Sequence, residues 1–252
     1  MNDRFKHASG ELWNGDCLDL MRSIPDGSVD MILCDLPYGT TACKWDTIIP
    51  FAPLWSEYWR VAKPNAAIVL TASQPFTTAL IGSQIERFKY CWVWKKNFST
   101  NFLHAKRQPL RNIEDICVFI KGSSRYYPIM TKNHIPTQSA KGCSKGKLWH
   151  GDNIRNYEGG VTTRYPTQFL EFDAVDPKNR RHPTQKPVAL FEYLIRTYTN
   201  PGETILDNCS GSGTTAVAAI NTGRRFICIE KDLGYYLASC GRVWEPSQPV
   251  KR

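Results

Sequence analysis

A carboxylate, a rigid turn and an aromatic ring follow a short apolar segment near the N-terminus. Residues 29–34 read Val-Asp-Met-Ile-Leu-Cys, and Asp35-Leu36-Pro37-Tyr38 come next. The apolar run predicts a buried strand, and the active sites of open α/β sheets lie at the carboxyl ends of such strands. This turn is therefore a candidate catalytic site. The alternative is structural, with Asp35 capping the next segment and Tyr38 packing beside a proline turn.

A second segment, 203–223, reads as a strand, a glycine turn and a helix. Gly211 and Gly213 permit tight backbone geometry and let a ligand approach the main chain. The segment has neither the G-K-[ST] of a Walker loop nor the third glycine of the dinucleotide fingerprint, which favours a nucleotide-like ligand without an extended phosphate chain. Glu230 ends the apolar run 226–229, where nucleotide-binding folds place a carboxylate for ribose hydroxyls. A plain strand-to-helix turn is the alternative.

Together these segments resemble motifs of the S-adenosylmethionine-dependent DNA amino-methyltransferases, specifically the N6-adenine branch. Residues 35–38, Asp-Leu-Pro-Tyr, are similar to the family's catalytic [DNS]-P-P-[YFW]; residues 207–215, Asp-Asn-Cys-Ser-Gly-Ser-Gly-Thr-Thr, are similar to its D-P-F-x-G-S-G-T-T cofactor motif. Residues 182–187, His-Pro-Thr-Gln-Lys-Pro, look like the cofactor-contacting segment that the family carries there. The order of catalytic motif, basic region and cofactor motif is that of the circularly permuted beta group. The resemblance covers residues 10–120 and 182–235.

Three positions depart from the family pattern. Leu36 replaces the first proline of the catalytic motif, but the family uses the backbone carbonyl there, which any residue supplies. Asn208 and Cys209 stand where the family has Pro and Phe, so no aromatic side chain stands at the position from which the family contacts the cofactor. Gly211 and Gly213 remain, and the loop geometry is expected to survive.

The resemblance implies a catalytic set, a cofactor set and no metal. The catalytic set is Asp35, Leu36, Pro37 and Tyr38. The set that binds S-adenosyl-L-methionine is Asp16, Cys17, Asp35, Thr184, Lys186, Asp207, Ser210, Gly211, Gly213, Thr214, Glu230 and Lys231.

The family's chemistry gives these residues expected roles. An adenine N6 is out of reach inside a duplex, so the base is flipped out and stacks on Tyr38. The Asp35 carboxylate and the Leu36 carbonyl accept both N–H bonds and aim the lone pair at the methyl group. Asp16 is expected near the cofactor's adenine, or alternatively as a helix N-cap, and Lys186 near the cofactor's carboxylate.

Positive charge is concentrated in two stretches of the chain. The formal net charge is +9; residues 86–111 hold seven basic and one acidic residue, and residues 121–181 hold eleven and five. Interleaved aromatics make this a composition typical of phosphate binding, although a solvated basic surface is the alternative. The residues expected to face the DNA backbone are Trp92, Trp94, Lys95, Lys96, Lys106, Arg107 and Arg111. The residues expected to recognise the target sequence are Arg155, Arg164, Arg180 and Arg181.

Apolar runs alternate with helical segments, which predicts an α/β fold with a doubly wound, mostly parallel, Rossmann-like sheet. Strands are expected at 12–13, 29–34, 66–71, 92–94, 116–120, 204–206 and 226–229, and a helix at 187–199. We predict a catalytic half at 1–120, a loop-rich inserted target recognition region at 121–181, and a cofactor-binding half at 182–252.

The composition of the chain limits the cellular compartment and the partners that we expect. The chain has no apolar run near 18 residues, no apolar signal at 1–6, and nine cysteines without a C-x-x-C pair, which predicts a cytoplasmic protein of a prokaryotic cell or phage-infected host, free of disulfides and zinc. Double-stranded DNA is the expected partner; a homodimer and a restriction endonuclease partner stay open, and no membrane is expected. Alternatives are cytosine-N4 methylation of DNA, methylation of RNA or of a protein amide, and a catalytically dead DNA-binding protein.

Overall fold

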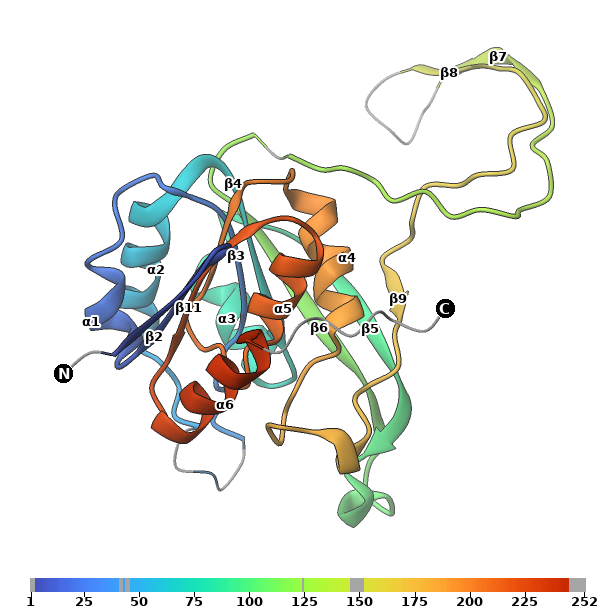
Figure 1. Ribbon diagram of the computed structural model, residues 1–252. Coiled ribbons are helices and arrows are strands. Elements are labelled where there is room, and N and C mark those ends of the chain that lie inside the picture. Colours follow the sequence, from blue (N-terminus) through green and yellow to red (C-terminus); the bar gives the residue numbers. More distant parts are fainter. Residues whose placement is uncertain (1–2, 41–42, 44–45, 124, 146–151, 245–252) are drawn as a thin grey trace. The chain divides into compact units, whose positions relative to one another are not determined.

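A computed structural model describes residues 3–40, 43, 46–123, 125–145 and 152–244 (Figure 1). The chain forms two compact units, one of Met1–Tyr127 with Gln168–Arg252 and one of Pro128–Thr167. The smaller unit holds the antiparallel pair β7 (Ala140–Lys145) and β8 (Asp152–Tyr157). It is narrower than the predicted recognition region 121–181, whose role in reading DNA stays a prediction.

The larger unit is built on a nine-stranded sheet in the order β1-β2-β11-β10-β3-β4-β6-β5-β9. Neighbours from β2 to β4 are parallel, whereas β1–β2, β4–β6 and β5–β6 are antiparallel. The strands are β1 (Arg4–His7), β2 (Gly10–Asn14), β3 (Val29–Asp35), β4 (Ala62–Ala72), β5 (Phe88–Thr100), β6 (Arg111–Ile120), β9 (Phe169–Glu171), β10 (Thr204–Asp207) and β11 (Arg225–Glu230).

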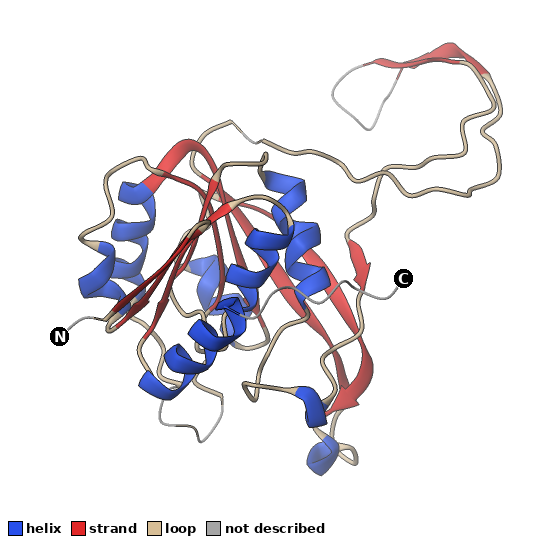
Figure 2. Ribbon diagram, viewed as in Figure 1, coloured by secondary structure: helices blue, strands red, loops and turns tan. Residues whose placement is uncertain are grey.

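Helices cover both faces of this sheet (Figure 2). Along β3, Met31 and Leu33 pack into one core and Ile32 and Cys34 into the other, which is why the strand is apolar at every position. One face carries α4 (Val188–Tyr198), α5 (Thr214–Asn221) and α6 (Leu233–Trp244), and the other α1 (Cys17–Met21), α2 (Phe51–Val61) and α3 (Phe76–Gly82). The predicted doubly wound α/β fold is confirmed. No helix of the described residues is long and apolar enough to cross a membrane.

The direction of winding changes between β3 and β10. From β3 the chain passes through α2 to β4 on one side, and from β10 it passes through α5 to β11 on the other. Open α/β sheets bind ligands in the crevice that forms at such a switch point. Asp35 and Asp207, the last residues of these two neighbouring strands, border it.

The expectation that Trp92 and Trp94 face DNA is wrong. β5 is paired on both sides, by β6 and by β9, so alternate side chains of this strand enter the core. Trp92 is 3% and Trp94 2% exposed. Their indole N–H groups donate to the Tyr198 hydroxyl (2.7 Å) and to the Phe172 carbonyl (2.8 Å). Along β5 the buried Trp92 and Trp94 alternate with the exposed Lys95, because neighbouring residues of a strand point to opposite faces.

Candidate active site

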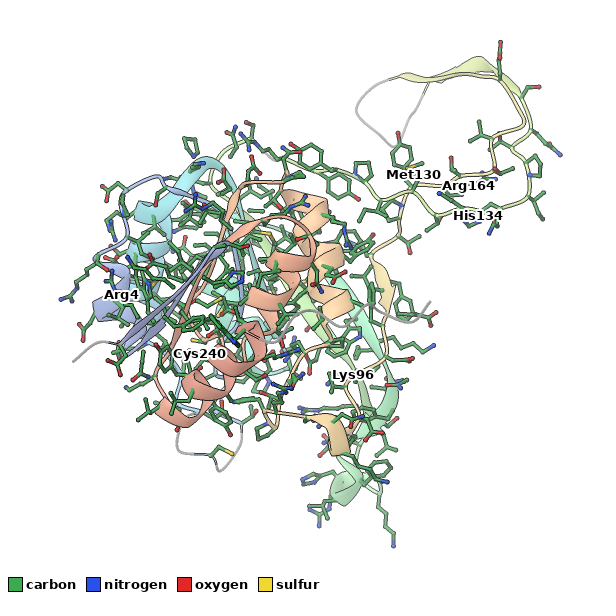
Figure 3. All side chains as sticks on the ribbon, viewed as in Figure 1. Arg4, Lys96, Met130, His134, Arg164 and Cys240 are labelled. Atoms are coloured by element: carbon green, nitrogen blue, oxygen red, sulfur yellow. The ribbon has the colours of Figure 1, made fainter. Side chains whose placement is uncertain are left out.

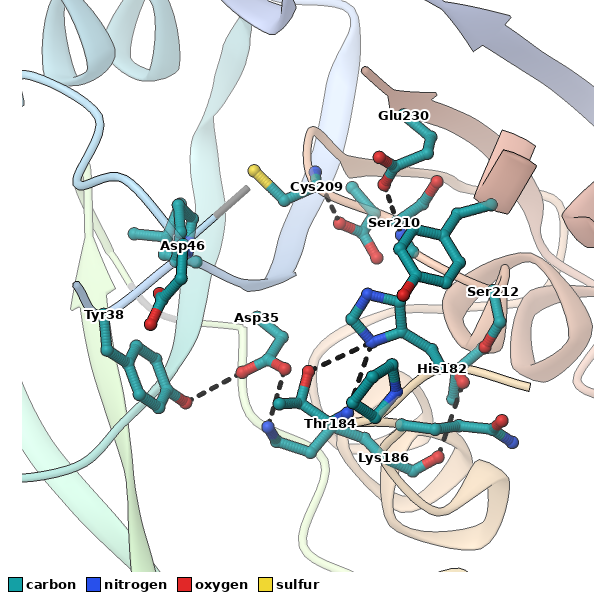
Figure 4. A pocket seen from close by; sticks show the side chains of 18 of the residues that line it. Asp35, Tyr38, Asp46, His182, Thr184, Lys186, Cys209, Ser210, Ser212 and Glu230 are labelled. Carbon is teal, nitrogen blue, oxygen red and sulfur yellow. Dashed lines mark hydrogen bonds and ion pairs between the residues drawn. The ribbon is translucent and has the colours of Figure 1, made fainter. Parts of the chain in front are cut away.

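A pocket of about 820 Å³ opens at the carboxyl ends of β2, β3, β10 and β11 (Figure 4). Side chains from β5, β6 and the segment before α4 complete its lining. The predicted catalytic and cofactor residues that line it are Asp16, Cys17, Asp35, Leu36, Pro37, Tyr38, Thr184, Lys186, Asp207, Ser210, Gly211, Thr214, Glu230 and Lys231. Three residues expected on DNA, Lys96, Arg111 and Arg180, also line it.

Asp35 is held by three donors. The Tyr38 hydroxyl donates to its Oδ1 at 2.8 Å, and the Thr71 hydroxyl donates to the same oxygen. On the other oxygen, Oδ2, the Lys186 ammonium lies at 2.6 Å (Figure 4). An ionised carboxylate offers about four acceptor positions, so one position of Oδ2 is left for a donor in the pocket.

The ammonium of Lys186 bridges two carboxylates. Its Nζ lies 2.6 Å from Asp35 Oδ2 and 3.3 Å from Glu114 Oε2, and Glu114 also pairs with Lys96. Burial by itself lowers the pKa of Lys186, but the charges of Asp35 and Glu114 outweigh it and raise that pKa above 10.5. Lys186 was expected beside the cofactor's carboxylate. Its ammonium pairs with the two acidic side chains and also lines the pocket, so its contact with the cofactor stays a prediction.

Tyr38 lines the pocket with its ring and reaches Asp35 with its hydroxyl. Phe76 stacks against one face of this ring at a centroid distance of 5.1 Å, and the Lys186 ammonium lies over the ring, 5.7 Å from its centroid. Burial, with the charges of Asp35 and Glu114, raises the pKa of Tyr38, so the hydroxyl stays protonated and donates. Asp46 fixes the turn that follows, since its carboxylate accepts from the backbone N–H of Gly39 (2.8 Å) and Thr40 (2.9 Å).

Glu230 closes the glycine loop from the neighbouring strand. Its Oε2 accepts from the Gly211 N–H at 2.7 Å and its Oε1 from the Asp232 N–H at 2.8 Å. Gly211 has a φ of +50° and lines the pocket. Ser212 and Thr214, on either side of Gly213, line the pocket, and the expected contact of Gly213 with the cofactor stays a prediction. A Cβ on Gly213 would lie 2.9 Å from the Ser239 Cβ, so this glycine, at a φ of +76°, allows α6 to pack closely.

The buried carboxylate of Asp207 holds both ends of the glycine loop through hydrogen bonds. It is 3% exposed, and its carboxylate accepts from the Cys209 N–H at 3.0 Å and from the Thr215 hydroxyl at the start of α5. Burial raises the pKa of Asp207 to about 7, although these hydrogen bonds oppose the rise. Asp207 therefore holds the loop in shape with both oxygens.

The raised pKa of Asp207 predicts a specific loss of stability with pH. As pH rises from about 4 to 7, the unfolded chain ionises at this residue before the folded chain does, so the folded state is progressively disfavoured. At 1.36 kcal/mol per pKa unit, the loss is about 4 kcal/mol. Urea unfolding from pH 4 to 8 is expected to show this decline relative to Asp207→Asn, with exposed Asp19→Asn as the control. A constant difference between the wild type and Asp207→Asn would contradict the assignment.

Asp16 caps a helix and also lines the pocket, so its position is compatible with both of its expected roles. It is the N-cap of α1, accepting from the Leu18 N–H at 3.0 Å, and it lines the pocket beside Cys17. Its Oδ2 pairs with the Lys231 ammonium at 3.1 Å. The bonds from Lys231 and Leu18 outweigh burial and lower the pKa of Asp16, so its carboxylate is ionised at neutral pH.

The remaining wall is suited to a nucleoside-like ligand. Ser210 Oγ is buried in the pocket lining and has no hydrogen-bond partner among the described residues. His182 stacks edge-on against Tyr235 at a centroid distance of 4.2 Å, with its Nδ1 3.1 Å from the Thr184 hydroxyl. Burial lowers the pKa of His182, so the imidazole is neutral near pH 7. The hydroxyl of Thr214, another lining residue, donates to the Lys186 carbonyl at 3.4 Å.

The residues expected on DNA fall into two groups. Several already have partners: Lys95 pairs with Glu171 and Lys96 with Glu114, while Arg180 donates to two backbone carbonyls in the pocket wall. In the second unit, the Arg164 guanidinium donates to the carbonyls of Val161, Thr163 and Ile135 (Figure 3). Lys106, Arg107, Arg111 and Arg181 are exposed, and the Arg111 guanidinium donates to the Gln74 carbonyl at 3.2 Å. Arg155 lies on β8 with its side chain outside the described part.

Sequence reasoning missed the residues that hold Asp35 and Tyr38 in place. These are Thr71 on β4, Phe76 on α3, Asp46 and Glu114. One signal was present for Glu114, because this acidic residue stands only two positions before the strand predicted at 116–120.

Comparisons with known proteins agree with this geometry. A family profile described as DNA methylase, N6_N4_Mtase, matches residues 29–239. The DNA adenine methyltransferase YhdJ of Escherichia coli strain K12 is 28% identical over 245 residues, which cover 92% of this chain and 82% of that protein. Two solved structures share the fold. The M1.HpyAVI–SAM complex has a TM-score of 0.64 at 21% identity, covering 93% of this chain and 99% of that one. The cytosine-N4-specific PvuII DNA methyltransferase has 0.68 at 16%, covering 98% and 89%.

The family profile spans more than half of the chain, including Asp35, Lys186, Asp207 and Glu230. The fold, the pocket and the profile lead to one conclusion: this chain belongs to the N6/N4 DNA methylase family, the S-adenosylmethionine-dependent DNA methyltransferases.

Proposed function

We propose that this enzyme transfers a methyl group to N6 of an adenine flipped out of double-stranded DNA at a specific sequence. The observation that carries the proposal is the free acceptor position of Asp35, a carboxylate held rigidly beside the Tyr38 ring in a deep pocket. The name of the relative YhdJ, a DNA adenine methyltransferase, supports the choice of adenine.

The cofactor half of the pocket fits S-adenosylmethionine. Glu230, which is partly buried and accepts from the Gly211 N–H, has lone pairs to spare for ribose hydroxyls. The unpartnered Ser210 hydroxyl and the ionised Asp16 carboxylate offer further polar contacts. When bound, the cofactor supplies an electrophilic methyl group on a sulfonium centre.

Asp35 and Leu36 orient the amine. The lone pair of the exocyclic N6 is delocalised into the adenine ring, so the nitrogen is a weak nucleophile until its hydrogens are held. Asp35 Oδ1 already accepts from Tyr38 and Thr71, so we assign one N–H of the amine to Asp35 Oδ2. The second N–H is assigned to the Leu36 carbonyl. Such positioning aims the lone pair at the methyl group and lowers the barrier without a covalent step.

Asp35 also stabilises the charge that develops during transfer. Positive charge builds on N6 as the new bond forms, and an ionised carboxylate in a partly buried site stabilises it electrostatically. The Asp35 side chain is 20% exposed and the Lys186 side chain 6% exposed, so water screens this interaction poorly. The proton that N6 then loses passes to Asp35 Oδ2. Tyr38 supplies the stacking surface for the flipped base, worth ~1–3 kcal/mol.

Expression in a host without DNA methylation, followed by single-molecule sequencing of its genome, tests this function. We expect N6-methyladenine in one short sequence throughout the genome, and none in cells that express Asp35→Ala. If the modified base is N4-methylcytosine, the target of this enzyme is cytosine and not adenine. An unmodified genome, with the folded protein present, would refute DNA methylation in this form.

A further inference from the structure

The tip of the β5–β6 hairpin exposes two large apolar side chains. Leu103 is 98% and Phe102 66% exposed, both in the 3-10 turn η1 (Phe102–His104). The tip is ordered by its own backbone, since Ala105 donates to the Phe102 carbonyl (3.1 Å) and Arg107 to the His104 carbonyl (2.8 Å). An almost fully exposed leucine on a structured turn gains nothing within this unit, which points to an external partner.

The charge around this tip is of one sign. Between Glu86 and Glu114 the sequence has seven basic residues and no acidic one. Lys106 and Arg107 lie on the tip itself and are exposed. Duplex nucleic acid has negatively charged phosphates outside and stacked, largely apolar bases inside. Basic side chains beside two exposed apolar ones are complementary to that arrangement.

The hairpin is continuous with the active-site pocket. Alternate residues of β5 line that pocket, as side chains on one face of a strand do. They are Trp94, Lys96, Phe98 and Thr100, and the exposed turn begins two residues later. Figure 1 shows the hairpin of β5 and β6 extending beyond the rest of the sheet. The apolar tip therefore follows directly on the wall of the pocket that takes the target base.

We propose that Phe102 and Leu103 are a wedge that enters the base stack of duplex DNA next to the flipped base. Apolar side chains of this kind part neighbouring base steps in other DNA-binding proteins, and an enzyme that extrudes a base must offset the loss of its stacking and pairing. Lys106 and Arg107 hold the phosphates on either side of the wedge. This inference rests on the proposed function.

The test compares two substrates for the double variant Phe102→Ala/Leu103→Ala. One is a duplex that carries the methylated sequence, and the other is the same duplex with an abasic site opposite the target adenine. We expect kcat/KM on the paired duplex to fall about 10- to 100-fold, and the abasic duplex to restore most of the loss because its target base is already unpaired. Ile85→Ala, an equally exposed apolar residue on a different segment (62%), should change neither rate.

Every other outcome overturns either the wedge or the proposed function on which it rests. Unchanged rates, or equal losses on both duplexes, would show that the tip does not assist base flipping. A variant that changes only the sedimentation of the free protein would show that a second copy of the chain covers the tip. Wild-type protein that methylates neither duplex would refute the proposed function itself, whereas wild-type activity with an unaffected variant would refute the wedge alone.

Discussion

Replacing Asp35 by alanine is expected to lower methyl transfer by about 10³-fold or more, while DNA and cofactor binding stay largely intact. The substitution removes the acceptor for one N6–H and the only carboxylate placed to stabilise charge on that nitrogen in the proposed mechanism. Losing a single preorganised electrostatic group in an active site costs about 10²–10³ in rate, and here positioning is lost with it. Single-turnover methylation of a duplex containing the target sequence measures the effect.

Asp35→Asn separates charge from shape. Asparagine keeps the size of the side chain and one oxygen, so it can still accept from Tyr38, but it carries no negative charge for Lys186 or for the amine. We expect a loss close to that of alanine. Cofactor titration by calorimetry and circular dichroism are the controls for folding. Full activity in Asp35→Ala would exclude the mechanism, and an active Asp35→Asn would show that geometry rather than charge carries it.

The residues at the sheet edge could be predicted because their positions depend on local pattern. Asp35 and Glu230 each follow an apolar run, and the carboxyl ends of parallel strands meet at one edge. The helix that begins after Pro187 was predicted from its apolar period, and its boundaries differ by only one residue at either end. Where a periodic segment and its stop signals agree, the fold follows from the sequence.

Contacts across the sheet could not be predicted in this way. Lys186 meets Asp35 across 151 residues of chain, and its partner Glu114 comes from an antiparallel hairpin on a third segment. Nothing in the local pattern distinguishes a lysine aimed at the cofactor from one aimed at a carboxylate. Trp92 was misassigned for a related reason: composition records which residues occur together, not which face of a strand each occupies.

Loss of Lys186 is the second large effect that we expect, and it should appear in stability as well as activity. Lys186→Met leaves Asp35 and Glu114 facing each other without the ammonium that bridges them. Removing one partner of a buried ion pair costs about 3–5 kcal/mol, because the remaining charge is uncompensated. We also expect a ~100-fold loss of methyl transfer, since Asp35 is no longer held on its Oδ2 side. Urea unfolding and single-turnover rates measure the two effects.

Three further variants separate the contributions of Lys186. Lys95→Met breaks an exposed pair, with side chains 45% and 66% exposed, and should cost less than about 1 kcal/mol. In Lys186→Met, Glu114 still pairs with Lys96, so Asp35 is the carboxylate that loses its ammonium partner. Adding Glu114→Gln removes the repulsion between the two carboxylates, so we expect part of the stability to return while the rate stays low, because the amide does not hold Asp35. Lys186→Arg keeps the charge and should retain more activity than methionine. If Lys186→Met unfolds at the same urea concentration as Lys95→Met, the buried ammonium does not stabilise this site; if its rate recovers with Glu114→Gln, the role of Lys186 is to balance charge and not to position Asp35.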